Sequence, residues 1–173
     1  MNNPVRKGHW LFVVTFLIAL ACDLGSKYLI ESRLAMWEEY EIWEGIFRFR
    51  LITNPGMMWG MAESVPAYIW VVIRGCVLVG LIWMYASLES HGRLAQLAFG
   101  LVCAGALGNI YDNIFQNPEA LFAGEVRDFL QFYWFEFPTF NVADSCICVG
   151  APLLLIVLWG HDRQARLAEE AAS

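Results

Sequence analysis

The chain has 173 residues, of which 58% are hydrophobic and only 16% are charged, and its formal net charge at pH 7 is −6. Soluble domains average about 45–50% apolar and about 25% charged residues, so this composition excludes intrinsic disorder and argues against a soluble globular domain. The sequence has no lysine- or arginine-rich run, which removes the electrostatic basis for binding nucleic acid. We therefore expect one integral membrane domain covering residues 1–173.

Four apolar stretches are long enough to cross the roughly 30 Å hydrocarbon core of a bilayer, which takes about 20 helical residues. These predicted spans lie near Trp10–Ile30, Pro66–Leu88, Leu94–Gln116 and Asn141–Gly160. The first stretch also resembles a cleaved signal peptide, because two basic residues precede an apolar run that reaches Cys22. However, the apolar run continues beyond Cys22 to Ile30, so we interpret it as a retained span.

The distribution of basic residues predicts the orientation. An even number of spans places both termini on one side of the membrane. The segments 1–9, 89–93 and 161–173 carry five basic residues, whereas the much longer loops 31–65 and 117–140 carry four. Because cytoplasmic segments are enriched in Lys and Arg, we expect both termini in the cytoplasm and both long loops outside.

The two outer loops contain signals of local structure. Residues 47–51 alternate apolar and basic side chains, which predicts a half-buried strand that ends at the turn signal 54–56. Residues 126–130 fit either a second strand or a short interfacial helix, and the acidic run 38–41 is interpreted as a solvated face. The expected fold is an all-α membrane protein with four transmembrane helices and a small extracytoplasmic cap that contains β-structure.

Ionisable side chains within membrane spans are costly, and they usually face a protein interior or water. Asp23 and Lys27 are four residues apart and share a helix face, so they fit either an intrahelical ion pair or a substrate-positioning role. Asp112 fits interhelical hydrogen bonding as well as a functional site. A row of small residues on the same span predicts tight helix packing; the row is Gly100, Ala104 and Gly108.

Four further polar residues each fit a structural role. Asn141 and Asp144 have the spacing of a helix capping box, so Asp144 taken alone fits a cap as well as a catalyst. Asp128 taken alone fits an exposed loop acid. Arg74 lies inside the second span, where snorkelling or pairing with an intramembrane acid is expected before chemistry. The five cysteines show no zinc or redox spacing, and no serine or histidine lies in a nucleophile motif.

The acids of the spans gather near one membrane interface, and this placement suggests aspartic chemistry. Two carboxyl groups close together do not both ionise readily, so one pKa rises and the pair shares a proton. The ionised partner can take a proton from water while the protonated partner polarises a scissile carbonyl. Such a pair hydrolyses amides without a metal or a covalent intermediate. Spacing alone does not select which two aspartates form the pair.

Five segments, in this order, resemble the motifs of the lipoprotein signal peptidase family, also called signal peptidase II. They are Asp23–Lys27, Asn54–Gly60, Gly105–Asp112, Val126–Phe129 and Phe137–Asp144. The resemblance implies a membrane-embedded aspartic endopeptidase that removes the signal peptide from diacylglyceryl-modified bacterial prolipoproteins. Cleavage then falls just before the lipidated cysteine.

The resemblance also implies roles for individual residues. Asp128 and Asp144, at the acid positions of the V-x-D-F and F-N-x-A-D motifs, correspond to the catalytic pair. The motif residues implied to line the substrate pocket are Asp23, Lys27, Asn54, Gly56, Asn109, Asp112 and Asn141. The family further implies the bacterial inner membrane, with prolipoprotein substrates and lipids as partners. We expect no nucleic acid, no metal or cofactor, and a monomer.

The chain departs from the family pattern at two places. Asn113 stands where the family usually has Arg after its G-N-x-x-D motif, which puts one charged substrate contact in question; Arg127 and Lys27 are candidates to supply that charge. Met57 and Met58 stand where the family often has a small pair.

Intramembrane acids also occur in two other classes of membrane protein. A proton- or ion-coupled transporter would space its acids through the membrane depth, and a non-catalytic assembly factor would tolerate Asn at both acid positions. The clustering of the acids at one interface favours the peptidase.

Overall fold

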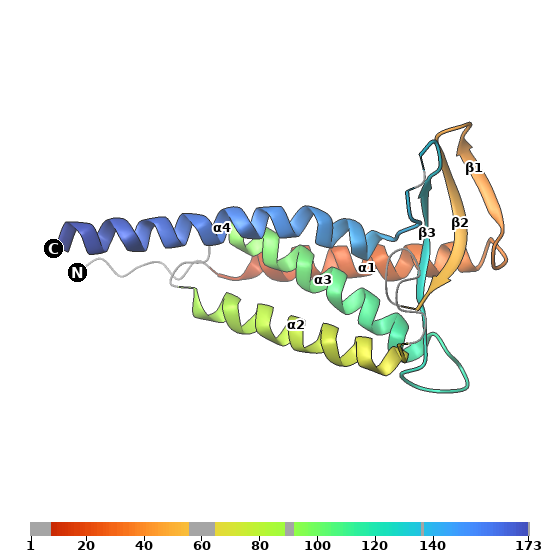
Figure 1. The fold of residues 1–173 in the computed structure, drawn as a ribbon, viewed down its shortest axis with the longest axis horizontal. Coiled ribbons are helices and arrows are strands. Elements are labelled where there is room, and N and C mark those ends of the chain that lie inside the picture. The colour runs from red at the N-terminus through yellow and green to blue at the C-terminus, as the bar shows by residue number, and fades with distance from the viewer. Residues whose placement is uncertain (1–7, 56–64, 89–91, 136, 173) are drawn as a thin grey trace.

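The structure, a computed structural model, describes residues 8–55, 65–88, 92–135 and 137–172. Four helices run along the long axis, and a small sheet closes one end (Figure 1). In chain order the elements are α1 (Trp10–Glu31), β1 (Glu39–Trp43), β2 (Phe47–Asn54), α2 (Ala67–Ser87), α3 (Arg93–Phe115), β3 (Val126–Phe132) and α4 (Val142–Ala172). Helix α1 begins and α4 ends at the end of the molecule opposite the sheet. The predicted fold class is confirmed.

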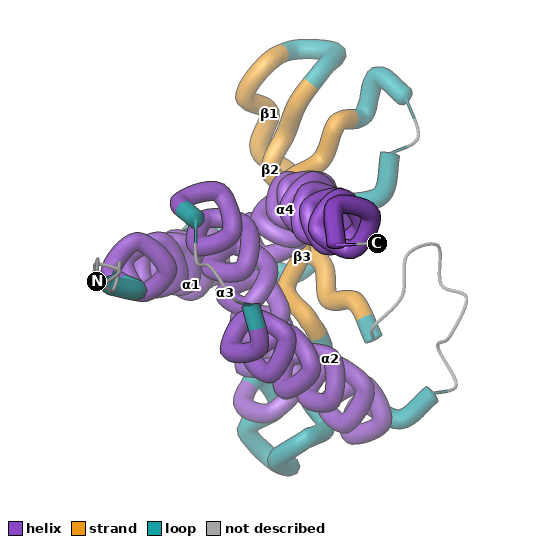
Figure 2. Tube along the Cα trace, turned by 90° about the vertical axis from the view of Figure 1, so that its left-hand side faces the viewer, coloured by secondary structure: helices purple, strands orange, loops and turns teal. Residues whose placement is uncertain are grey.

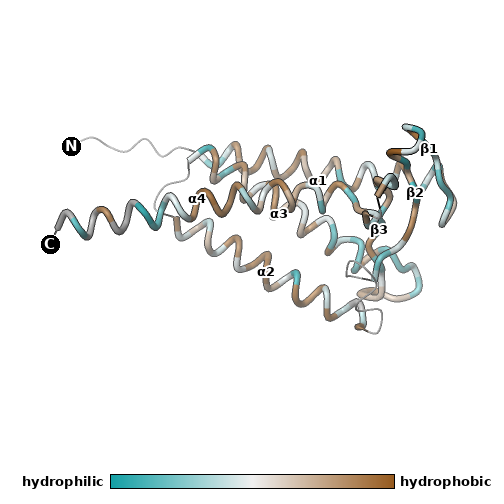
Figure 3. Tube along the Cα trace, turned by 45° about the horizontal axis from the view of Figure 1, so that its top comes forward, coloured by the Kyte–Doolittle hydropathy of each residue, from teal (hydrophilic) through white to brown (hydrophobic). Residues whose placement is uncertain are grey.

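Each of the four helices is long and apolar enough to cross a membrane. The bounds agree with the predicted spans to within a few residues, except that α4 continues beyond Gly160 to Ala172. Large apolar side chains on the helices face outward; Trp83 and Trp159, for example, are 72% and 75% exposed. Such exposure suits a lipid environment, and Figure 3 shows apolar residues along all four helices.

Helix α3 is the centre of the bundle, because it packs against α1, α2 and α4 (Figure 2). Small residues permit this close packing, as predicted. A Cβ added at Gly100 would lie 3.0 Å from Cβ of Thr15 on α1, and one added at Gly105 would overlap the backbone oxygen of Ala143 on α4. Helices α1 and α4 are therefore held against α3 at van der Waals distance.

The three strands form one antiparallel sheet in the order β1-β2-β3. Strand β2 is the predicted strand, and β3 resolves the alternative for residues 126–130 in favour of a strand. The acidic run is exposed as expected, but part of it forms β1, which was not predicted. Glu39 of β1 pairs with the basic residues of β2: it contacts Arg48, and its Oε1 lies 3.2 Å from Nε of Arg50.

The sheet is fixed to the bundle by a small apolar cluster and by the chain that follows β3. Ile30 at the end of α1 packs with Leu51 of β2 and Phe129 of β3, all buried. Beyond β3, the backbone of Phe140 forms an antiparallel bridge with Leu130, with N···O distances of 2.8 and 3.0 Å. This bridge brings the start of α4 beside β3.

Candidate active site

Two acids meet where β3 faces the beginning of α4. Asp128 lies in the buried part of β3, and Asp144 lies in the first turn of α4. Asn141 links them: its Nδ2 donates to Oδ1 of Asp128 at 2.7 Å, and its Oδ1 accepts from the backbone N–H of Asp144 at 2.9 Å. The bridge between Leu130 and Phe140 places Asn141 within reach of both residues.

Asn141 and Asp144 form the predicted capping box. The backbone N–H of Asn141 donates to Oδ2 of Asp144 at 3.2 Å, while the Asn141 side chain accepts the reciprocal bond. The favourable interaction of a carboxylate with a helix N-terminus adds to this. The cap does not compete with a catalytic role, because it fixes the Asp144 carboxyl group in one orientation.

Amide groups from two other elements complete the hydrogen bonding of the acids. Asn54, the last residue of β2, donates from Nδ2 to Oδ2 of Asp128 at 3.0 Å. Asn109 of α3 donates from Nδ2 to Oδ1 of Asp144 at 2.9 Å. Each carboxyl group therefore accepts two hydrogen bonds from N–H donors, and these bonds fix the orientation of both acids.

The two acids differ in exposure. Asp128 is only 1% exposed, whereas Asp144 is partly exposed. Burial, and after it the nearby charge of Asp144, raises the pKa of Asp128 to about 7, although hydrogen bonds from Asn54 and Asn141 and the charge of Lys27 oppose the shift. At neutral pH the Asp128 carboxyl group can therefore carry a proton, while Asp144 is the acid that water can reach.

A buried ion network lies under the acid pair. Nζ of Lys27 is 2.8 Å from Oδ2 of Asp23 and 3.1 Å from Oδ2 of Asp112, and all three side chains are at most 1% exposed. Lys27 also donates to Oδ1 of Asn109 at 3.3 Å. The expected intrahelical ion pair is present, and it is joined to α3 through Asp112.

The same network attaches β3 to the helices. Nη2 of Arg127 lies 2.7 Å from Oδ1 of Asp112, and the Arg127 backbone N–H donates to Oδ2 of Asp112 at 3.0 Å. Nη1 of Arg127 is 2.7 Å from Oε2 of Glu31 at the end of α1. Asp112 therefore provides the bonding between elements that the sequence suggested, and it fixes the residue next to Asp128.

Asp23 connects α1 with the start of α4. Its Oδ1 accepts from the backbone N–H of Ala143 at 2.8 Å, one residue before Asp144. This contact requires Gly108, because a Cβ at that position would overlap Oδ2 of Asp23. The small-residue row of α3 thus determines how closely the ion network approaches the acids.

The sequence pattern of the signal peptidase (SPase) II family matches residues 15–160, the stretch that contains all of these side chains.

The chain belongs to the signal peptidase II family.

Relatives support this assignment over nearly the whole chain. The lipoprotein signal peptidase of Symbiobacterium thermophilum is 35% identical over 150 residues, which cover 86% of this chain and 93% of that protein. The one from Desulfitobacterium hafniense is 34% identical over 161 residues, covering 92% and 99%. A solved bacterial membrane enzyme, determined by the in meso method at 2.3 Å, aligns with a TM-score of 0.75 and 25% identity over 86% of this chain and 87% of that one. The membership confirms a peptidase and does not support the transporter or assembly-factor alternatives.

Arg74 approaches the site at the position where the chain departs from the signal peptidase II pattern. Its Nη1 donates to Oδ1 of Asn113, and Nδ2 of Asn113 donates to the backbone oxygen of Gly124 at 3.0 Å. Arg127 and Lys27, the residues expected to supply the charge of the family's Arg, both pair with Asp112 in the ion network. The sequence feature that could have pointed to Arg74 is that it is the one charged residue within the apolar stretch of α2.

Parts of the predicted pocket lie outside the described residues, namely Gly56, Met57 and Met58.

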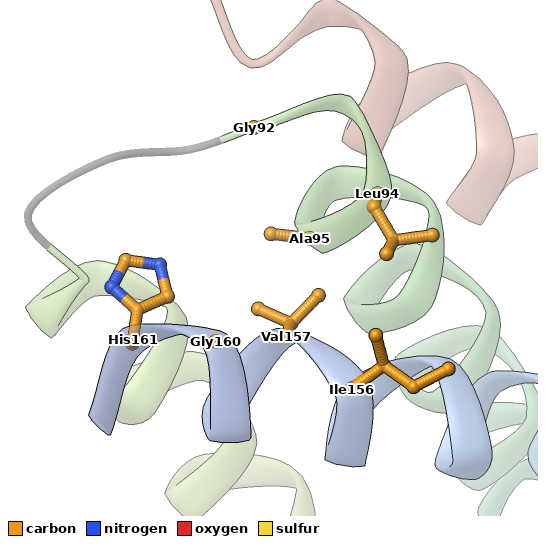
Figure 4. Close-up of a pocket in the computed structure, with 7 residues that line it drawn as sticks. All are labelled: Gly92, Leu94, Ala95, Ile156, Val157, Gly160 and His161. Atoms are coloured by element: carbon orange, nitrogen blue, oxygen red, sulfur yellow. The ribbon is translucent and has the colours of Figure 1, made fainter. Parts of the chain in front are cut away.

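A hollow lies at the end of the bundle opposite the acid pair. Figure 4 shows this cavity of about 210 Å³, lined by the beginning of α3 and by α4. Its lining residues are Gly92, Leu94, Ala95, Ile156, Val157, Gly160 and His161. None of them is acidic, and Ile156 lies 12 residues beyond Asp144 on the same helix, about 18 Å at 1.5 Å per residue. The hollow is therefore separate from the acid pair.

Proposed function

We propose that Asp128 and Asp144 are the catalytic pair of an aspartic endopeptidase that removes the signal peptide from diacylglyceryl-modified bacterial prolipoproteins, just before the lipidated cysteine. One observation carries the assignment: two carboxyl groups from different elements are joined through Asn141 at the end of a membrane bundle. Membership of the signal peptidase II family supports the reaction and the substrate class.

The two acids take different steps. Asp144, the more accessible acid, accepts a proton from a water molecule, and the water oxygen attacks the scissile carbonyl carbon. Protonated Asp128 donates its proton to the carbonyl oxygen, which gives a neutral tetrahedral diol. Asp144 then passes its proton to the amide nitrogen and the C–N bond breaks. One diol hydroxyl returns its proton to Asp128 as the new carboxyl group forms, so the enzyme regains its starting state.

The remaining predicted residues support this pair. Asn54, Asn109 and Asn141 orient the two carboxyl groups through the hydrogen bonds described above. Asn54 is also partly exposed, so it can meet the substrate peptide directly. We place Asp23, Lys27, Asp112 and Gly56 around the same pocket, with the three charged residues setting its shape.

The place of the site in the membrane fits a lipid-anchored substrate. Both termini face the cytoplasm and the acid pair lies at the outer face, in the bacterial inner membrane. The acyl chains of a diacylglyceryl cysteine hold the scissile bond at the outer interface, so anchoring supplies proximity and the enzyme has only to orient the peptide. A single chain supplies both acids, which is compatible with a monomer acting among membrane lipids.

Cleavage of a purified diacylglyceryl prolipoprotein tests the proposal. Asp144→Asn keeps the shape of the side chain but cannot accept the proton, so we expect at least a 100-fold loss, within the usual range for a general base. Asp162→Asn, an exposed acid far along the same helix, is the matched control and should cleave normally. Wild-type rates for folded Asp144→Asn or Asp128→Asn would show that the pair is misassigned.

A further inference from the structure

The buried charges near the acid pair divide into two groups. In the first group, Lys27 and Arg127 face Asp23 and Asp112 at distances of 2.7 to 3.1 Å. Two cations and two anions balance one another there. Glu31, which is partly exposed, adds a further contact to Arg127 at the rim. The cations of this group therefore make their direct ion pairs with carboxylates other than the proposed catalytic pair, although the charge of Lys27 also acts on Asp128.

The second group consists of the acid pair and Arg74. The Arg74 guanidinium donates to Asn113, which lies one turn along α3 from Asn109, and Asn109 donates to Oδ1 of Asp144 at 2.9 Å. From this position its charge acts on Asp144, Asp128 and Asp112. The guanidinium comes from α2, and its contacts include the hydrogen bond to Asn113 and the ring of Trp70, whose centroid is 5.8 Å from Cζ of Arg74. Arg74 therefore adds a positive charge on the α2 side of the acids.

The charge balance of this second group depends on one proton. A pair that shares one proton carries a single negative charge, which the Arg74 guanidinium compensates. With no proton the pair would exceed Arg74 by one negative charge, and with two protons Arg74 would be left uncompensated. Because an uncompensated charge is costly away from water, the group is most stable with one proton on the pair.

We propose that Arg74 is the counter-ion of the aspartate pair, a positioning residue that keeps Asp128 and Asp144 in the singly protonated state that the reaction needs. The inference rests on the proposed function, because it concerns the same two acids. The charged groups that face the pair are Asp23 and Lys27 from α1, Arg74 from α2, Asp112 from α3 and Arg127 from β3.

The pH dependence of kcat/KM for prolipoprotein cleavage tests this role. Removing a nearby cation favours protonation of a carboxylate, so in Arg74→Gln the acidic limb should move to higher pH by about 1 unit. Activity on that limb then falls about tenfold, with a smaller loss at higher pH. Arg74→Lys, which retains the charge, should leave the limb closer to the wild-type position. Arg93→Gln makes the same change at the far end of α3 and should leave the profile unchanged.

A double variant that moves the guanidinium to another helix distinguishes the effect of its charge from the effect of side-chain packing at residue 74. Asn113 contacts Arg74, so Arg74→Gln combined with Asn113→Arg returns a guanidinium to nearly the same place from α3. We expect this double variant to fold and to recover the wild-type position of the acidic limb. If Arg74→Gln alone does not fold, the double variant still tests whether a positive charge at this place sets the position of the acidic limb.

Two results would overturn the counter-ion role: an unmoved or uniformly lowered profile in Arg74→Gln, or a double variant that does not recover the limb. Both results are judged against a wild-type enzyme that cleaves the prolipoprotein and whose pH profile of kcat/KM has an acidic and a basic limb. A wild-type protein that fails to cleave would instead refute the proposed function, so the two failures are distinguishable.

Discussion

Asn141 uses its side-chain oxygen, its side-chain nitrogen and its backbone N–H within the site. It caps α4 through the backbone N–H of Asp144, and it orients Asp128 through Nδ2. Its Nδ2 also lies 3.2 Å from Oδ1 of Asn109. Because one side-chain amide makes the hydrogen bonds to both Asp128 and the backbone of Asp144, a substitution at Asn141 disturbs both acids together.

Asn141→Ala should therefore cost both stability and activity. Loss of the cap removes about 1 kcal/mol from the free energy of unfolding, and loss of the link to Asp128 lowers kcat by at least tenfold. Thermal unfolding in detergent and single-turnover cleavage measure the two effects. Asn117→Ala is a matched control, because Asn117 also accepts a backbone N–H, that of Glu119 at 2.9 Å, but lies in the loop after α3. Normal cleavage by Asn141→Ala would contradict the linking role.

The raised pKa of Asp128 predicts how stability depends on pH. The folded protein binds this proton with a pKa of about 7, against an ordinary value of 3.8. Between these values the folded state holds a proton that the unfolded state has lost, so stability falls as pH rises through the window. Above pH 7 the penalty reaches at most about 4 kcal/mol, since one pKa unit corresponds to about 1.4 kcal/mol.

Asp128→Asn removes that penalty along with the activity. We expect the variant to be more stable than the wild type at pH 8, by up to a few kcal/mol, and nearly equal to it at pH 4. Unfolding in detergent at both pH values gives the comparison, with the exposed-acid variant Asp162→Asn as the control. A variant that is less stable than the wild type at pH 8 would contradict the assigned environment of Asp128.

At the scale of the elements, the site exists because α3 lets α1 and α4 approach one another. Gly108 faces Asp23, and Asp23 in turn binds the backbone N–H of Ala143 at the start of α4. The acid in α4 is thus positioned by a residue of α1 across a glycine of α3. Close helix contact through small residues is a common means of association in membranes.

Gly108→Ala should displace Asp23 from this contact. We expect a loss of about 1–3 kcal/mol in stability from overpacking, together with reduced cleavage because the start of α4 shifts. Gly75→Ala is the matched control on α2, where an added Cβ meets nothing within 4 Å; it should cleave normally. Unfolding and cleavage assays of the two variants measure this difference, and equal behaviour would show that the approach at Gly108 is unimportant.

The elements differ in how far the sequence could predict them. The four spans follow from the length of their apolar stretches, and β2 follows from its alternation. Residues 126–129 of β3 are buried at every position, so no period distinguishes a strand from a helix there. All five residues of β1 are exposed, so the short alternation at residues 39–42 buries no face, and this strand depends on pairing with β2.

The site was predictable only in part, for a related reason. The capping box and the ion pair at residues 23 and 27 are local, so their spacing predicts them. The contact of Asn141 with Asp128 depends on the bridge at Phe140, and the family resemblance rather than spacing identified the two acids. Arg74 reaches Asn113 from 39 positions away, and no spacing in the sequence relates these two residues.

At the scale of the whole molecule, the sheet and the acid pair lie at one end, and the beginning of α1 and the end of α4 lie at the other (Figure 1). One orientation in the membrane therefore determines which compartment the site serves. The basic residues favour the cytoplasm for the end that carries both termini. A prolipoprotein anchored in the outer leaflet requires the same orientation, because its scissile bond lies at the outer interface.

Cysteine labelling in intact cells tests this orientation directly. In a variant whose five cysteines are replaced, Ala120→Cys, in the exposed loop after α3, should react with a membrane-impermeant maleimide in intact spheroplasts. Gly92→Cys, exposed at the opposite end of α3, should react only after lysis, because the bilayer shields it. Prolipoprotein cleavage by both variants provides the control for folding. Labelling of Gly92→Cys before lysis, with Ala120→Cys protected, would invert the topology and place the acid pair on the side away from its proposed substrate.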